Sequence, residues 1–358
     1  MKKALTCCAL ALALTSLSSM AKQEKMAAID HQIASWVAQH NYSGAAIIIV
    51  KDDKPIFEKY YGGYTSQTEV HIASAGKWLA AATIASLVDD GVLSWNDPVR
   101  KWLPAFTDSK GDATLRELFS HTSGYPDYQP ANKPEDHYQT LTESVAHILP
   151  LPSVNPPGTT FNYGGLAMQV AGRMAEVASG KSWESLFQER IAQPLGMTHT
   201  GFTPVSEEQG FSPMLAGGAR TTLADYRRFL QMIAHNGQFE GRQILSTAAI
   251  TMMQSDQLQG AKILPGAVNR YVQDVRGQAR NDIYGLGEWR EQVDNQGRPL
   301  LISSPGWAGS YPWIDKTNNS YGVILAKVNL SVAHKTGFNS FYAGPQLIPA
   351  IREALATQ

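Results

Sequence analysis

Strand-like patterns of apolar residues stand at the two ends of the chain. The stretch SGAAIIIVKDDKPIFEKYYGGY, over residues 43–64, reads as two strands joined by a turn at residues 52–54, and such a pattern predicts a β-hairpin. After residue 283 the pattern returns in YGLGEW, PLLIS, SYPWID and YGVILAKV. Helical patterns over residues 22–40 and 343–356 flank these strands. We therefore expect one sheet built from both ends of the chain.

The region between the two ends has a helical periodicity. Its apolar residues recur at helical spacing in several segments, and long loops separate these segments. Residues 255–283 are polar and irregular, which indicates a loop that covers a functional site. The predicted fold is therefore α/β, of the α+β type: an antiparallel sheet flanked by helices (residues 22–70 and 283–358) with an inserted, mostly helical subdomain (residues 71–282). The helices are expected over residues 75–89, 114–120, 164–178, 183–191, 222–234 and 246–254.

The first residues have the pattern of a targeting segment. Lys2 and Lys3 precede an apolar stretch over residues 4–17, and the small residues around position 20 predict cleavage after Ala21. The alternative is a membrane anchor, but the apolar stretch is shorter than the roughly 20 residues that a span requires. The only two cysteines lie in this leader, so the mature chain, residues 22–358, has no thiol. We expect export, to a bacterial periplasm.

The composition limits the partners of the chain. With 43% hydrophobic and 17% charged residues, it is an ordinary globular chain with enough apolar material for a core. The net charge of −1 becomes −3 when Lys2 and Lys3 are removed, and no run of five like charges occurs, which argues against a nucleic-acid partner. We expect no stable membrane anchor, and the oligomeric state stays open.

One lysine interrupts an otherwise apolar helical stretch, HIASAGKWLAAATIASLVDDG, over residues 71–91. Lys77 follows Ser74 by three residues, which places the two side chains on one face of a helix. A serine hydroxyl needs a nearby base to act as a nucleophile, and burial at a helix N-terminus lowers the pKa of an amine. Backbone N–H groups at the same N-terminus can hold an oxyanion.

The same residues have a plainer interpretation. Ser74 can be a helix N-cap, and Lys77 can extend along the helix to solvent. The spacing Ser-x-x-Lys also occurs at Ser19 and Lys22, across the predicted cleavage site. The spacing alone therefore does not decide between a catalytic pair and a structural one.

The surrounding blocks resemble the serine hydrolase superfamily of class C β-lactamases, D-alanyl-D-alanine peptidases and β-lactamase-like (family VIII) carboxylesterases. The resemblance covers most of the mature chain, in the family's order, and implies a β-lactamase/transpeptidase-like fold with Ser74 and Lys77 as the Ser-x-x-Lys motif. The blocks are HIASAGKWLAAATIASLVDDGVLSWNDPV, TLRELFSHTSGYPDY, PPGTTFNYGG, IAQPLGMTHTGF, AGGARTTLADYRRFLQMI and YGLGEW.

The second motif of this family is Tyr-x-Asn after a Pro-Gly turn. Tyr163 matches the tyrosine, which in the family shares a proton network with the lysine, but Gly165 stands where the family has asparagine. In the family, the side-chain amide of this asparagine contacts the acylamide group of β-lactam or peptide substrates, and Gly165 has no such amide. A nearby cation such as Lys77 lowers a tyrosine pKa, so either Lys77 or Tyr163 can be the general base. Ser153-Val154-Asn155 is a competing Ser-x-Asn match, in a segment that reads as loop.

The third motif of the family is Lys-Thr-Gly or His-x-Gly on an inner strand. A literal Lys335-Thr336-Gly337 follows the last strand, whereas the family motif precedes two further strands, so we do not assign it. The order of elements assigns Ser304-Pro305-Gly306 instead, and Trp307 then supplies the second oxyanion-hole N–H beside that of Ser74. The family's cation at this triplet holds a β-lactam carboxylate. Its absence here favours a neutral ester.

Other residues are weaker candidates. Tyr125 and Arg220 lie in blocks expected around the cleft, where they can contact an apolar group and an anionic substrate respectively. Core packing and a surface ion pair are the alternatives. His121, in FSHTSG, is a structural residue in the family. No G-x-S-x-G or H-E-x-x-H pattern occurs, and we expect neither a metal nor a cofactor.

These observations predict a serine hydrolase that works through an acyl-enzyme on Ser74. A carboxylesterase-like hydrolase of small esters is favoured. The alternatives are an amidase, D-peptidase or weak β-lactamase acting on amides, and a non-catalytic protein of the same fold that binds peptidoglycan or a partner.

Overall fold

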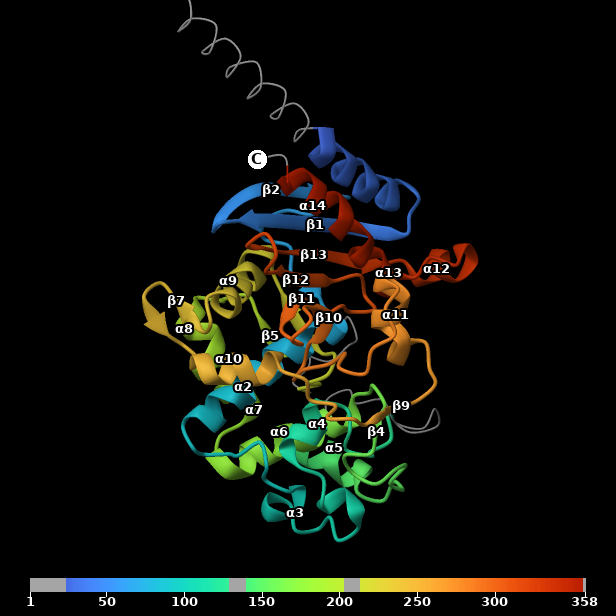
Figure 1. Cartoon of the computed structure of the whole chain (residues 1–358). Helices are drawn as coiled ribbons and strands as arrows, with labels where there is room; N and C mark the ends of the chain where they lie inside the picture. Colours follow the sequence, from blue (N-terminus) through green and yellow to red (C-terminus); the bar gives the residue numbers. More distant parts are fainter. Residues whose placement is uncertain (1–23, 129–139, 203–212, 357–358) are drawn as a thin grey trace, which may run out of the picture.

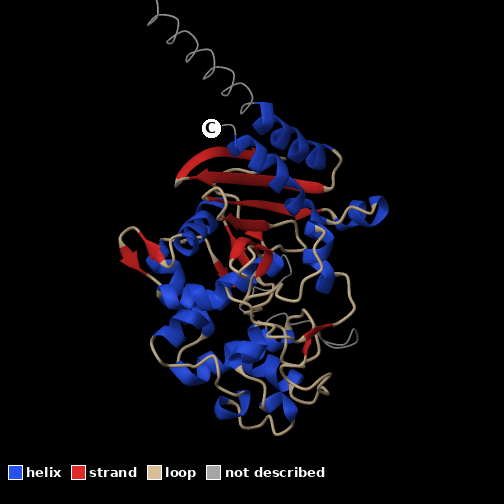
Figure 2. Cartoon of the chain, in the orientation of Figure 1, coloured by secondary structure: helices blue, strands red, loops and turns tan. Residues whose placement is uncertain are grey.

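A computed structural model describes residues 24–128, 140–202 and 213–356. A six-stranded antiparallel sheet in the order β10-β11-β12-β13-β1-β2 lies in the upper half of the molecule in Figure 2. The sheet combines both ends of the chain, as predicted, while the predicted leader lies outside the described residues. The strands are β1 (Tyr42–Lys51), β2 (Lys54–Tyr61), β10 (Trp289–Val293), β11 (Pro299–Ser303), β12 (Tyr311–Asp315) and β13 (Ser320–Val328).

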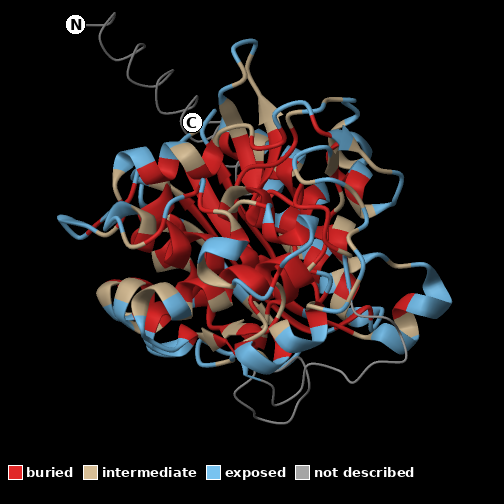
Figure 3. Ribbon diagram, turned by 90° about the horizontal axis from the view of Figure 1, so that it is seen from below, coloured by how far each residue is buried: buried red, intermediate tan, exposed pale blue. Residues whose placement is uncertain are grey.

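Helices cover both faces of this sheet. The helix over residues 24–38 and α14 (Ile348–Ala356) lie over one face, at the top of Figure 1. The other face packs on α2 (Gly76–Asp89) and α9 (Leu223–Ala234). Strand β1 is a continuous apolar run because both of its faces are buried. Ile47 and Ile49 pack under the helix over residues 24–38 and α14, and Ile48 and Val50 pack on the side of α2 and α9. Figure 3 shows this buried interior.

The inserted region is mostly helical, and every helix predicted there is present within a few residues of its expected bounds. A three-stranded sheet in the order β3-β6-β5 lies beside it, with smaller pairs β4-β9 and β7-β8. These strands are β3 (Val70–His71), β4 (Thr160–Phe161), β5 (Gly201–Phe202), β6 (Ala219–Thr221), β7 (Gln238–Phe239), β8 (Arg242–Gln243) and β9 (Lys262–Ile263). The further helices are α3 (Val99–Trp102), α4 (Leu115–Phe119), α5 (Leu141–Ile148), α6 (Leu166–Ser179), α7 (Trp183–Phe187), α8 (Gln193–Leu195), α10 (Thr247–Gln254), α11 (Tyr271–Arg276), α12 (Leu330–Thr336) and α13 (Ser340–Ala343), with short helical turns η1 (Ala73–Ala75), η2 (Ser109–Gly111), η3 (Gln188–Ala192), η4 (Val268–Arg270) and η5 (Gly344–Leu347).

The strand predicted for YGLGEW is wrong over most of its length, because β10 begins only at Trp289. The two glycines of this segment serve close approach instead. A Cβ on Gly285 would lie 2.1 Å from the carbonyl oxygen of Met253, and one on Gly287 would lie 2.6 Å from that of Lys77. Gly287 also has a φ of +77°, which favours glycine. The segment therefore turns tightly against the helix that carries Lys77.

The segment over residues 255–283 is more ordered than a loop. It contains β9, η4 and α11, and its apolar side chains form a separate small core. That core includes Tyr271, Tyr284 and Trp289, and it also encloses Tyr163. None of the helices in the described ranges is both long and apolar enough to cross a membrane.

Candidate active site

Ser74 lies in a tight turn that leads into α2. Ala73, just before it, has a φ of +48°, a left-handed conformation that is uncommon for a residue with a side chain and is often found at functional sites. Neighbouring elements hold this turn in place. The Ile72 N–H donates to the Ala219 carbonyl (3.0 Å), and the Tyr226 hydroxyl donates to the Ala75 carbonyl (2.8 Å). The serine is thus presented from a fixed backbone.

Lys77 is buried directly behind Ser74, as the spacing predicted. Its side chain is 1% exposed, and its Nζ donates to Ser74 Oγ (3.0 Å) and to the Ala216 carbonyl (2.7 Å). Within the described ranges no carboxylate pairs with it. Burial lowers the pKa of Lys77 to about 7, because desolvation disfavours the charged amine. At neutral pH a substantial fraction of the amine is therefore free to accept the proton of Ser74.

Tyr163 completes a three-residue cluster. Lys77 Nζ lies 4.6 Å from the centre of its ring. Burial raises the pKa of Tyr163 above its ordinary value; the nearby Tyr128 acts in the same direction, and a hydrogen bond with Ser74 opposes it. The phenol therefore keeps its proton at neutral pH and can serve as an acid. Of the two bases that the sequence left open, the surroundings favour Lys77.

The assigned third triplet lies against the Ser74 turn. The buried Ser304 hydroxyl donates to the carbonyls of Gly287 (3.1 Å) and Ser74 (3.3 Å). A Cβ on Gly306 would lie 2.1 Å from the Ile72 carbonyl oxygen, so only glycine allows this approach. Pro305 stands between them and offers no N–H. The hydroxyl of Ser304 is thus used by the backbone, and the triplet brings no cation to the site.

Trp307 follows this triplet at the rim. Its side chain is 43% exposed, and its ring centre lies 6.0 Å from that of His71. Neither the Trp307 N–H nor the Ser74 N–H has a hydrogen-bond partner in the part of the chain that the structure describes. Two unpaired N–H groups on abutting segments are what an oxyanion hole requires.

Gly165 lies beside the cluster, and Arg220 lies on β6, which pairs with the strand that leads into the Ser74 turn. A Cβ on Gly165 would lie 3.3 Å from the Ala216 Cβ and 3.7 Å from the Tyr128 ring, so this position is next to the residue whose carbonyl holds Lys77. Arg220 pairs with His71 across β3 and β6, and its charge contributes, after burial, to lowering the pKa of His71.

Three other matches lie away from the nucleophile. Tyr125 is buried, its hydroxyl donates to the Lys110 carbonyl (3.0 Å), and it packs on Phe106. Tyr125 is therefore a core residue, and its side chain does not contact Ser74. Lys335-Thr336-Gly337 ends the exposed helix α12, which agrees with not assigning it. In the competing Ser-x-Asn match, the Ser153 hydroxyl donates to two loop carbonyls, those of Gly124 (3.3 Å) and Asn155 (3.1 Å).

Sequence reasoning missed the groups that hold Lys77 and Tyr163. The Ala216 carbonyl is a backbone acceptor, and no side-chain pattern identifies such a group. Asn269 accepts the Tyr163 N–H through Oδ1 (2.9 Å). Trp289 stacks on the Tyr163 ring, with centres 5.3 Å apart. Both belong to segments read as loop or strand, and their role depends on contacts between distant parts of the chain.

His121 also contacts Tyr163, at 4.5 Å between ring centres. It accepts the Gly164 N–H at Nδ1 (3.4 Å), so its proton is on Nε2, which faces the Tyr284 hydroxyl (3.3 Å). Burial, and then the charge of Lys77, lowers its pKa well below 6.5. His121 is therefore neutral and holds the tyrosine loop. A small surface hollow beside it is lined by residues of 121–127 and 155–167, without Ser74, Lys77 or Tyr163.

Comparisons with known proteins agree with this geometry. The Beta-lactamase family model matches residues 26–337. The D-alanyl-D-alanine-carboxypeptidase/endopeptidase AmpH of Escherichia coli K12 is 27% identical over 301 residues, 75% of this chain and 74% of the relative. The crystal structure of a candidate beta-lactamase from Bacteroides dorei DSM 17855 is 51% identical, covers 92% of this chain and 98% of that chain, and has a TM-score of 0.86. EstCE1, a hydrolase with promiscuous acyltransferase activity, has a TM-score of 0.73 at 19% identity, covering 93% and 99%; this likeness shows the fold alone.

Proposed function

Because this chain belongs to the beta-lactamase family of serine hydrolases, we propose that it hydrolyses small neutral carboxylic esters through an acyl-enzyme on Ser74. The observation that carries the proposal is the buried pair of Ser74 and Lys77, whose Oγ and Nζ are 3.0 Å apart. A buried amine with a pKa of about 7 is matched to proton transfer near neutral pH.

In the proposed mechanism Lys77 starts the reaction. Its neutral amine takes the Ser74 proton as Oγ attacks the acyl carbon, and the N–H groups of Ser74 and Trp307 hold the oxyanion. The Tyr163 hydroxyl protonates the leaving alkoxide and is reprotonated by Lys77. Water then attacks the acyl-enzyme, gives its proton to Lys77, and the acid leaves as Ser74 regains its hydrogen. Each proton taken from Ser74 or water thus ends on the alcohol or on Ser74.

The surroundings support an ester rather than a β-lactam as substrate. The hydroxyl of Ser304 is used by two backbone carbonyls, so this position lacks the cation that holds a β-lactam carboxylate in the resembling enzymes. Gly165 supplies no amide for an acylamide group. A neutral ester needs neither contact.

Peptidase activity is the second candidate. It is supported by the E. coli relative, whose name is that of a D-alanyl-D-alanine carboxypeptidase and endopeptidase. Under this alternative the same Ser74 acyl-enzyme forms from a D-alanyl amide.

An activity screen with a Ser74→Ala control separates these candidates. The chain from residue 22 is incubated with p-nitrophenyl butyrate, a D-alanyl-D-alanine peptide and a chromogenic cephalosporin. We expect turnover of the ester, at least a hundredfold lower turnover of the other two, and none by Ser74→Ala. Turnover of the peptide above that of the ester would establish the second candidate instead. The protein is also incubated with a fluorophosphonate, which labels active serines. If it turns over no substrate and forms no adduct, the remaining interpretation is a non-catalytic binding protein of this fold.

We also propose that the chain is exported after cleavage behind Ala21. The proposal rests on the leader pattern and on the absence of cysteine beyond it. N-terminal sequencing of the protein from a periplasmic fraction should start at Lys22. A protein that keeps Met1 and stays with the cytoplasm would contradict it.

A further inference from the structure

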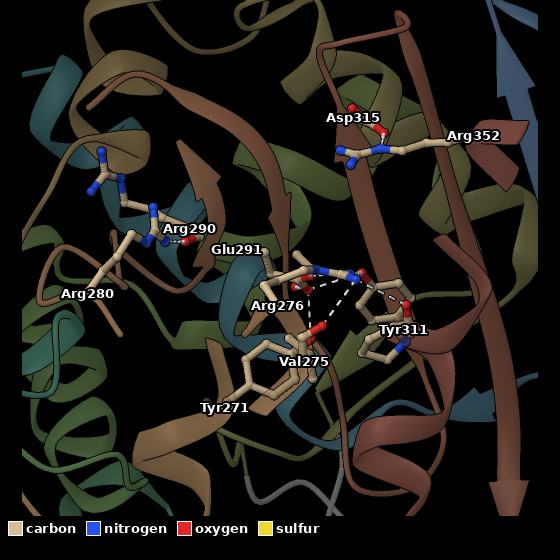
Figure 4. A network of polar contacts seen from close by, with 11 residues as sticks. Tyr271, Val275, Arg276, Arg280, Arg290, Glu291, Tyr311, Asp315 and Arg352 are labelled. Atoms are coloured by element: carbon tan, nitrogen blue, oxygen red, sulfur yellow. Dashed lines mark hydrogen bonds and ion pairs between the residues drawn. The ribbon is translucent and has the colours of Figure 1, made fainter. Parts of the chain in front are cut away.

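A buried carboxylate lies between the two halves of the candidate site, outside the mechanism described above. Glu291 on β10 is completely buried, and four different side chains donate to it. Its Oε1 accepts from the hydroxyls of Tyr271 (2.6 Å), Tyr311 (3.0 Å) and Ser303. Its Oε2 accepts from Arg276 Nε (2.7 Å). Figure 4 shows Tyr271 and Arg276 of α11 and Tyr311 of β12 converging on Glu291.

One side of this cluster leads to Tyr163. Tyr271 and Arg276 are the two ends of α11, so Glu291 attaches this helix to the sheet at both ends. The Tyr271 ring packs on Trp289 (4.9 Å between centres), which stacks on Tyr163. The turn η4, just before α11, carries Asn269, which accepts the Tyr163 N–H. The ring and the backbone of Tyr163 are therefore both held by elements that Glu291 attaches to the sheet.

The other side leads to the oxyanion hole. Ser303, which donates to Glu291, precedes Ser304 at the end of β11, and Ser304 donates to the Ser74 carbonyl. Gly306, in the same short segment, approaches the Ile72 carbonyl. The position of the Trp307 N–H depends on this segment. One carboxylate thus contacts both the segment that holds the proton donor and the segment that offers the oxyanion-hole N–H.

We propose that Glu291 is a positioning residue, which fixes Tyr163 and the segment from Ser303 to Trp307 relative to Ser74. A cluster of four donors on one buried carboxylate is rigid, because moving any donor leaves a buried polar group unpaired. A displacement of about 1 Å in catalytic groups is enough to lower turnover strongly. The inference rests on the proposed hydrolase function.

The test compares Glu291→Gln with a matched control on another strand of the same sheet. Asp315 on β12 is also buried and pairs with Arg352 (Nε to Oδ2, 2.6 Å), and its carboxylate also accepts from Thr317 and Asn318 in the turn after β12. Figure 4 shows this pair apart from Glu291. Asp315→Asn therefore breaks a buried ion pair of the same sheet away from the site. Tyr271→Phe is a milder second variant, which removes one donor and leaves Glu291 paired with Arg276.

We expect Glu291→Gln to lower kcat for the ester at least tenfold with KM changed less than twofold, and Tyr271→Phe to lower it about threefold. The midpoint of the pH profile should move upwards from about 7 in Glu291→Gln, since a displaced Tyr163 admits water to Lys77. Asp315→Asn should keep kcat within twofold of wild type, even if it lowers the melting temperature as much as Glu291→Gln does. Wild-type kcat and pH profile in a folded Glu291→Gln variant would overturn the proposal. If that variant does not fold, wild-type kcat in Tyr271→Phe would do so.

Amide hydrogen exchange separates a failure of this inference from a failure of the proposed function. In Glu291→Gln the peptides that cover residues 161–166 and 303–308 should exchange faster than in wild type, and in Asp315→Asn they should not. This readout needs no substrate. An inactive wild type with the expected exchange pattern would refute the hydrolase function and keep the positioning role. Unchanged exchange in an active enzyme would refute the positioning role alone.

Discussion

Lys77 and Lys110 are buried to the same extent, 1% exposed, but only Lys110 has a carboxylate partner among the residues that the structure describes. Lys110 lies against the carboxylate of Asp108 and donates to the Leu151 carbonyl (2.7 Å). Lys77 faces Ser74, a carbonyl and an aromatic ring. A carboxylate partner keeps a buried amine charged, whereas burial without one makes it a base. The partner, more than the burial, separates a structural lysine from a catalytic one.

Activity should separate the two lysines most strongly. We expect Lys77→Met to lower kcat for p-nitrophenyl butyrate by about a thousandfold, because loss of a general base typically costs a hundred- to ten-thousandfold. Lys110→Met should stay within threefold. The measurement is p-nitrophenol release by both purified variants, with circular dichroism as the folding control. Equal losses in both variants would end the distinction.

The pH dependence of the wild-type enzyme gives a second test. Only the neutral amine of Lys77 accepts a proton, and its pKa is about 7. We expect kcat/KM to fall about tenfold for each pH unit below this midpoint, and to level off above it. A plateau that extends unchanged down to pH 5 would mean that Lys77 is not the base.

Stability should change in opposite directions in the two variants. Lys77 has a folded pKa of about 7, below its ordinary 10.5, so the folded chain binds fewer protons than the unfolded one between these values, and this lysine's contribution to stability rises with pH there. Removing this buried amine should outweigh the loss of about 1–2 kcal/mol at the unpaired Ala216 carbonyl, so Lys77→Met should raise the free energy of unfolding by roughly 2–4 kcal/mol at pH 7, and less towards pH 10.

Lys110→Met should instead lower the free energy of unfolding by about 1–2 kcal/mol, through the unpaired Leu151 carbonyl. The effect is moderate because the Asp108 side chain is 50% exposed and stays solvated. Urea unfolding of both variants at pH 7 and pH 9.5 measures the two signs. A loss of stability in Lys77→Met at pH 7 would contradict the account of an uncompensated buried amine.

The smallest effect is expected at a third lysine. Lys335 belongs to the literal Lys-Thr-Gly triplet but lies exposed on α12. Lys335→Ala should leave kcat/KM for the ester and for the chromogenic cephalosporin within twofold of wild type. A tenfold loss would show that the triplet, rather than Ser304-Pro305-Gly306, serves the site.

Much of this architecture follows from local patterns. The apolar runs predicted β1 and β13, and helical periodicity predicted α2, α6 and α9, because these patterns reflect burial on one or both faces. Ser74 and Lys77 could be paired from sequence because three residues along a helix fix their distance. Tyr163 lies 86 residues after Lys77 in the chain, so no local spacing connects the two, and only the family resemblance assigned Tyr163 to the site.

The remaining features depend on contacts between distant segments. Gly285 and Gly287 resemble strand residues, and their close approach to Met253 and Lys77 is visible only in three dimensions. The same holds for Glu291, which reads as one acidic residue among many until Tyr271 and Arg276 converge on it. Tyr125 looked like a cleft residue because its block lies near the site, but its own side chain turns into the core.

The acyl-enzyme itself tests the central claim most directly. Wild type and Ser74→Ala are mixed with p-nitrophenyl butyrate, quenched in acid within the first turnover, and measured by intact mass and peptide mapping. The account predicts a mass increase of one butyryl group on the wild type, carried by the peptide that contains Ser74, and no increase on a folded Ser74→Ala. An adduct on another residue, or ester turnover by Ser74→Ala at the wild-type rate, would contradict it.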